Sequence, residues 1–152
     1  MMTVSCCPEC GARYTTAGDT CLNRFDALLA LDHSRREPWG SRLGQAFAAF
    51  ALQHPERHAA SLDRAWGALY RIYMTHEPPR RVFAAFVGHR DGVPSDWSVP
   101  GRPERPASTP SVTIADLADF DAQTYPELLD RWCLASLAAW GLAVDSPQAN
   151  ER

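Results

Sequence analysis

The sequence predicts a mainly α-helical fold, a single-domain bundle of five to six helices with an N-terminal zinc knuckle and a proline-rich loop. Three observations support this prediction. Apolar residues recur at helical spacing in several segments. Four of the five cysteines lie within the first 21 residues, and five prolines lie between residues 91 and 111. A chain of 152 residues is long enough to bury about 68–70% of its unfolded surface.

We expect one helical domain over residues 1–145, with the knuckle in residues 1–21 and the proline-rich loop in residues 91–111. A flexible tail follows over residues 146–152. Trp97 within the loop indicates that this segment docks on the helical body, because an exposed linker has little use for a large aromatic side chain.

The first two helices are predicted from their caps and apolar spacing. The first helix runs from Thr20, which can cap it, to about Asp32. The second is expected over residues 42–54, and Pro55 marks its end. One stripe of this second helix is predicted to face the core, formed by Phe47, Phe50, Ala51 and His54.

The third and fourth helices are expected over residues 60–75 and 79–89. Ser61 is the predicted cap of the third helix. Prolines open the fourth, where they suit a first helical turn. The large aromatic residues of the third and last helices are predicted core residues, and a ligand pocket between helices is the alternative; they are Trp66, Tyr70, Tyr73, Trp132 and Trp140.

Two capping boxes are predicted in the C-terminal third of the chain. Thr113 and Asp116 have the spacing of a box that opens a short helix. Thr124 and Glu127 form a second box at the start of the last helix, which is expected to end near Leu142.

Composition excludes several classes of protein. No stretch of about 18 apolar residues is present, so we expect no transmembrane helix. The N-terminus lacks the basic and apolar regions of a secretory signal, which predicts a cytoplasmic location in which clustered cysteines bind metal. A net charge of −3 without a long basic stripe argues against nucleic acid as the main partner.

The strongest chemical motif is Cys7-Pro8-Glu9-Cys10-Gly11. Two residues between the cysteines allow both sulfurs to reach one ion, and Gly11 tolerates the positive φ that such a turn needs. Cys21 lies at the start of the first predicted helix, where the helix N-terminus favours the thiolate. Local sequence therefore predicts three ligands of a zinc ion.

A closed structural site needs a fourth ligand, and no second CxxC motif is present. The candidates are His54, His33, Cys6 and Cys133. We favour His54 because it shares a helix face with Phe50; the alternative is a hydrogen-bonded core histidine. Cys133 is most simply a core residue, and Cys6 is either a bystander or a replacement ligand.

These motifs resemble a bacterial family, domain of unknown function 5946. The resemblance rests on the knuckle motif, on a cysteine near residue 20 and on the segment Phe50-Ala51-Leu52-Gln53-His54-Pro55; its further matches are Asp96-Trp97, Thr113-Ile114-Ala115-Asp116 and the helix from Arg131-Trp132 to Ala139-Trp140. It implies an α-rich domain with zinc on Cys7, Cys10, Cys21 and His54, and no established activity. Histidines typical of the family before and after the second helix are missing here.

Three hypotheses about function follow. The first is a zinc-stabilised cytoplasmic protein that acts by binding a protein or a small molecule. The second is a small accessory enzyme of bacterial metabolism with a pocket between aromatic helices; three thiolates make zinc a poor Lewis acid, which disfavours a reaction on the metal. The third is a zinc-knuckle module for nucleic acid, for which Arg13 and Arg24 are the local cations and which the net charge disfavours.

Overall fold

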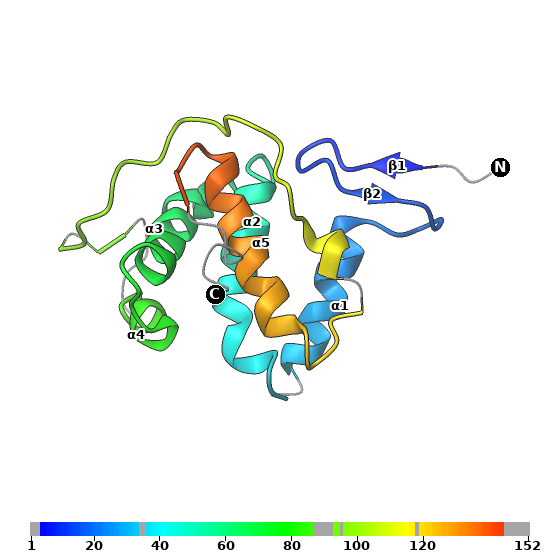
Figure 1. Ribbon diagram of the computed structural model, residues 1–152, viewed down its shortest axis with the longest axis horizontal. Coiled ribbons are helices and arrows are strands. Elements are labelled where there is room, and N and C mark those ends of the chain that lie inside the picture. The colour runs from blue at the N-terminus through cyan, green and yellow to red at the C-terminus, as the bar shows by residue number, and fades with distance from the viewer. Residues whose placement is uncertain (1–3, 34–35, 87–92, 95, 118, 145–152) are drawn as a thin grey trace, which may run out of the picture.

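The computed structural model describes residues 4–33, 36–86, 93–94, 96–117 and 119–144, without the side chains of residues 32 and 33. It confirms the mainly helical prediction (Figure 1). The α-helices are α1 Cys21–His33, α2 Leu43–Gln53, α3 Leu62–Tyr73, α4 Pro79–Ala84 and α5 Tyr125–Ala139. Short 3-10 turns are η1 Gly40–Arg42, η2 Ala59–Ser61 and η3 Ile114–Leu117, and two strands, β1 Ser5–Cys6 and β2 Arg13–Tyr14, precede α1. The predicted tail, 146–152, lies outside the described residues.

Helix α2 is the centre of the molecule. It packs against both α3 and α5, and α1 crosses its other side. Most of its positions are buried, and many are alanine, so neighbouring helices can approach it closely. Ala46, Ala49 and Ala51 are completely inaccessible to solvent. The sequence of α2 is almost entirely apolar because most faces of this helix are buried.

Helix α5 places large aromatic residues against α2. Trp132 and Trp140 are fully buried, as the core prediction requires. The indole N–H of Trp140 donates a hydrogen bond of 2.9 Å to the carbonyl oxygen of Leu52, near the end of α2. This bond satisfies a polar group that would otherwise be costly to bury, and it fixes the end of α5 beside the end of α2.

The caps differ from their predictions in two of four cases. The Thr20 hydroxyl accepts a hydrogen bond from the Asn23 N–H at 3.0 Å. The Asp116 carboxylate accepts from the Thr113 N–H, as a capping box requires, and the Thr113 hydroxyl accepts from the N–H of Ala115. Ser61 and Thr124 make no side-chain cap bond. Their backbones already have near-helical angles, whereas a capping residue is normally extended. The Thr124 hydroxyl instead turns back toward Asp121.

Helices α4 and α5 end earlier than predicted. Helix α5 stops at Ala139, because Gly141 adopts φ +101° and the Leu142 N–H bonds back to the carbonyl of Leu137. Helix α4 stops at Ala84, where the following N–H is shared between carbonyls of the last turn. The predicted end of α4, residues 87–89, lies outside the described residues.

The prediction that Phe47 faces the core is wrong. Phe50 and His54 are buried, but Phe47 is 39% exposed. Its ring contacts Phe25 on one side and lines a groove between helices on the other. Phe47 lies to one side of the most buried positions of α2. It is exposed because α3 and α4 leave that flank of the helix open, as a groove.

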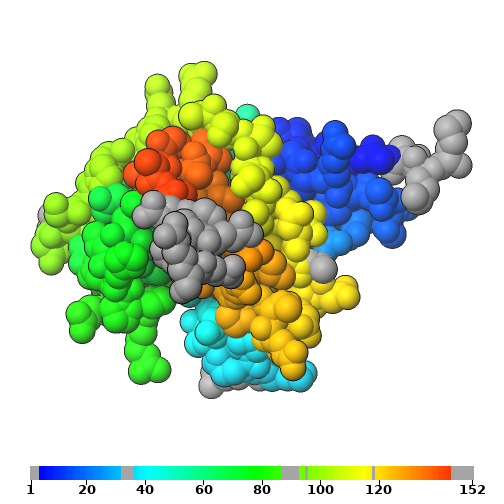
Figure 2. Space-filling model, viewed as in Figure 1, coloured from blue at the N-terminus to red at the C-terminus, as the bar shows by residue number. Residues whose placement is uncertain are grey.

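The proline-rich loop docks on the helices, as Trp97 predicted. The N–H groups of Ala107 and Ser108 both bond to the carbonyl oxygen of Ala139 at 2.8 and 3.0 Å, and the Trp66 indole donates to the carbonyl of Pro100. The loop runs over one end of the bundle and reaches the N-terminal hairpin (Figures 1 and 2). Among the described helices, none has the length and apolar character needed to cross a membrane.

Gln53 joins the loop to two helices. Its side-chain amide donates to the carbonyl of Val112 at 2.8 Å and to the Ser136 hydroxyl at 3.0 Å, and it is buried. We predict that Gln53→Ala lowers the free energy of unfolding by about 1–3 kcal/mol, because a buried carbonyl loses its donor. Urea denaturation measures this change. Gln123→Ala, at an exposed position, is the matched control; an equal loss in both variants would contradict the assignment.

Candidate metal centre

The knuckle is a hairpin rather than an irregular loop. Strands β1 and β2 pair antiparallel, with Ser5 opposite Tyr14 and Cys6 opposite Arg13. Within the turn, the Gly11 N–H bonds to the carbonyl of Cys7 at 2.9 Å. Gly11 has φ +79°, as the motif predicted, and a Cβ there would come within 2.9 Å of Thr109. The turn therefore requires glycine for its conformation and for its contact with the long loop.

Two other segments bring the remaining side chains to this turn. Cys21 is the first residue of α1, and His54 immediately follows α2. His54 leaves the helical conformation, with φ −131° and ψ 62°, as expected before Pro55. The Glu9 carboxylate also accepts a hydrogen bond of 2.9 Å from the Glu56 N–H, which holds the turn against the end of α2.

The four predicted ligands meet in one group that could hold a metal ion. The ligand atoms of Cys7, Cys10, Cys21 and His54 all lie within 4.8 Å of one another. The sulfurs of Cys10 and Cys21 are 3.6 Å apart. In a tetrahedral zinc site with metal–sulfur bonds of about 2.3 Å, two sulfurs are separated by roughly 3.8 Å. The observed spacing therefore fits a shared tetrahedral ion.

The imidazole of His54 is oriented for coordination. Its Nδ1 lies 2.8 Å from the carbonyl oxygen of Phe50, so Nδ1–H is the donor and Nε2 keeps its lone pair. His54 is 1% exposed, and its Nε2 has no hydrogen-bond partner among the described residues. The ring also stacks on Phe50, with centroids 4.1 Å apart. A buried nitrogen without a partner is costly, and a metal ion would satisfy it.

One thiol of the group, Cys21, is already biased toward the thiolate form that binds a cation. The hydrogen bond from Cys10 lowers the pKa of the Cys21 thiol to about 4, against the opposing effect of burial, and His54 and Tyr14 act in the same direction. The same bond raises the pKa of Cys10, which acts as the donor. One thiolate is thus stabilised by its surroundings, and a bound cation would favour the remaining ones.

Sequence reasoning did not identify Tyr14 as part of this site. Its hydroxyl donates a hydrogen bond of 3.0 Å to the sulfur of Cys21, and the Arg24 guanidinium lies 5.4 Å from the centre of its ring. The alternation of apolar Ala12, charged Arg13 and aromatic Tyr14 is the sequence signal that could have revealed it, since alternation of this kind is typical of a strand.

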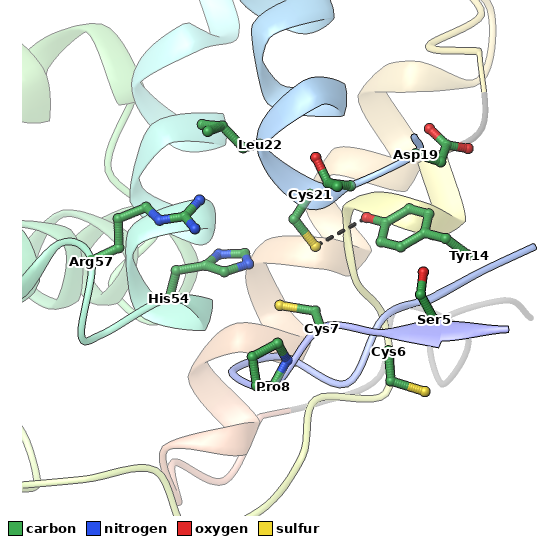
Figure 3. A pocket seen from close by; sticks show the side chains of 11 residues that line it. Ser5, Cys6, Cys7, Pro8, Tyr14, Asp19, Cys21, Leu22, His54 and Arg57 are labelled. Carbon is green, nitrogen blue, oxygen red and sulfur yellow. Dashed lines mark hydrogen bonds between the residues drawn. The ribbon is translucent and has the colours of Figure 1, made fainter. Parts of the chain in front are cut away.

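The other candidate ligands have different surroundings. Cys133 is fully buried in α5, and its thiol contacts the carbonyl of Gln45 at 3.6 Å, as expected for a core residue. Cys6 is exposed, and its sulfur points away from Cys7 and His54 (Figure 3). The side chain of His33 lies outside the described part of the chain.

A cavity of about 370 Å³ opens beside this group (Figure 3). Cys7, Cys21 and His54 line it, but Cys10 does not. Its rim also carries Arg57 and Asp19. Solvent and small molecules therefore have access to one side of the candidate metal centre.

The chain matches one protein-family model. No curated protein and no solved structure matches the chain. A family model matches residues 5–141, which include the hairpin, every described helix and the four residues of the candidate metal centre. The match spans most of the 152 residues. The chain therefore belongs to the family of unknown function DUF5946.

Proposed function

We propose that this chain binds one structural Zn²⁺ ion through Cys7, Cys10, Cys21 and His54. The observation that carries the proposal is the approach of four zinc-type donors within 4.8 Å of one another, including a buried Nε2 without a hydrogen bond. Three sulfurs and one nitrogen match the donor preference of zinc, and four donors fill its tetrahedral shell. A filled shell favours a structural role over hydrolysis on the metal.

The ion would connect parts of the chain that have few other contacts. Strands of two residues each are too short to be stable alone. Zinc would cross-link this hairpin to the start of α1 and the end of α2, so its binding energy would contribute to folding. The proposal also places the chain in a reducing compartment such as the cytoplasm, where the thiolates remain free to bind metal.

The first test is metal content. We expect one zinc per chain by elemental analysis of protein purified without added metal. Cys10→Ser should lose the zinc and lower the free energy of unfolding by about 3 kcal/mol or more, which lowers Tm by about 6–12 °C at this length. Cys133→Ala, outside the group, should retain the zinc. Absence of zinc from the unmodified chain would refute the proposal.

The second test is metal removal. A strong chelator should make the amides of the hairpin, residues 5–14, exchange with solvent much faster, because the hairpin then loses its main anchor. Amides in the middle of α2 and α5 should keep most of their protection, because those helices pack on each other. Hydrogen exchange with mass spectrometry reads both regions. Unchanged exchange in the hairpin would show that the ion does not hold it.

A second function, the binding of a small molecule, is supported by a groove between helices α1, α2, α3 and α4. It has a volume of about 330 Å³ and is lined mainly by apolar side chains from α1 to α4, including Leu29, Phe47 and Phe83. None of the tryptophans and tyrosines predicted as pocket residues lines it. We propose that it binds a small apolar molecule, because a groove of this size with exposed phenylalanine is typical of such sites.

Binding of Nile red tests this second function. Phe47→Ser should weaken dye binding about tenfold, because it removes most of an aromatic contact of about 1.5 kcal/mol or more. Leu22→Ser, at another exposed apolar residue outside the groove, is the matched control. Equal dye binding by the two variants and the unmodified protein would contradict the groove as the site.

A further inference from the structure

We propose that Cys7 is the reactive ligand of the metal centre, and that its thiolate is alkylated by small anionic electrophiles that enter the adjoining cavity. The proposal rests on the proposed zinc site and adds a chemical reaction to it. Two features of the structure distinguish Cys7 from the other two thiols, namely its exposure and its hydrogen bonding. The charge of the cavity, which Cys7 shares with Cys21, predicts the class of electrophile.

Cys7 is more accessible to solvent than the other two thiols of the group. Cys10 and Cys21 are buried, whereas Cys7 is only partly buried. Cys7 also lines the cavity of about 370 Å³, with its sulfur directed toward the ring of His54 (Figure 3). A small reagent can therefore approach this sulfur without displacing the hairpin. Cys10 faces no part of that cavity.

Hydrogen bonding distinguishes the sulfurs further. The sulfur of Cys21 accepts a bond from the Tyr14 hydroxyl at 3.0 Å, and the sulfurs of Cys10 and Cys21 lie 3.6 Å apart, within hydrogen-bonding distance of each other. Within the described residues, the sulfur of Cys7 accepts no hydrogen bond, although the Cys7 backbone is bonded on both sides. A hydrogen bond stabilises a thiolate and lowers its nucleophilicity, so Cys7 keeps the most reactive lone pair.

The charge of the cavity predicts the class of electrophile. Asp19 is paired with Arg24 at 3.3 Å, but Arg57 makes no ion pair with any described residue. An unpaired guanidinium on the rim attracts anions. A reagent with a negative group and a soft reactive carbon therefore matches the cavity better than a neutral one of equal size.

The reaction is a simple displacement. The thiolate of Cys7 attacks the carbon of the electrophile, a sulfur–carbon bond forms, and the leaving group departs with the electron pair of its broken bond. No oxidant or reductant is needed. The product keeps the negative group of the reagent, but its sulfur is now an uncharged thioether. A thioether is a weaker zinc ligand than a thiolate, so alkylation would loosen the hairpin from α1 and α2.

Iodoacetate is the probe. Zinc-loaded Cys6→Ser protein, which lacks the exposed neighbouring thiol, is treated with iodoacetate and mapped by mass spectrometry over time. We expect carboxymethylation of Cys7 to be about tenfold faster than that of Cys10 or Cys21. Adding Arg57→Gln should slow the reaction with iodoacetate about threefold and leave the reaction with neutral iodoacetamide unchanged. Arg13→Gln, outside the cavity lining, should change neither rate.

The outcomes separate this inference from the zinc proposal. Zinc content is measured on the same sample before labelling. A chain that holds zinc but is labelled first at Cys10 or Cys21, or at none of the three until a chelator removes the ion, overturns the reactive-ligand proposal and leaves the metal centre intact. Equal slowing of both reagents by Arg57→Gln overturns the preference for anions. A chain that carries no zinc overturns both proposals.

Discussion

The attachment of the N-terminal hairpin to the helices depends on the meeting of the Cys7–Cys10 turn with Cys21 and His54. The hairpin itself has two pairs of opposed residues and lies at one end of the molecule (Figure 1), where the hydrogen bond between Glu9 and Glu56 is a further contact with the segment after α2. The centre joins the hairpin, the start of α1 and the end of α2. Because α3 and α5 also pack on α2, the centre attaches the hairpin to the central helix of the bundle.

The end of α2 combines two roles in adjacent residues. Gln53 directs its amide into the bundle, toward the long loop and α5, whereas His54 directs its Nε2 toward the thiols. Pro55 ends the helix, and the contact between Glu9 and Glu56 then closes the hairpin against it. The adjacent residues Gln53 and His54 therefore link the packing of the core to the candidate metal centre within one short segment.

The sequence was sufficient to predict the helices and the four residues that meet in the candidate metal centre, because both depend on local patterns. Apolar spacing identified α1, α2, α3 and α5, and the position of His54 beside Phe50 on one helix face identified the fourth member. The hairpin strands, for which residues 12–14 carry only a short alternation, the capping behaviour of Ser61 and Thr124, and the exposure of Phe47 were not predicted. Each depends on how distant segments pack: the strands pair across the turn, and α3 and α4 leave one flank of α2 open.

The central claim is that one zinc ion joins three sulfurs and one imidazole nitrogen. X-ray absorption at the zinc edge of the purified chain tests it most directly, because the signal reports the ligands of the metal themselves. The account predicts three sulfur neighbours at about 2.3 Å and one nitrogen at about 2.0–2.1 Å. A shell dominated by oxygen, or one with sulfur and no imidazole contribution, would contradict it.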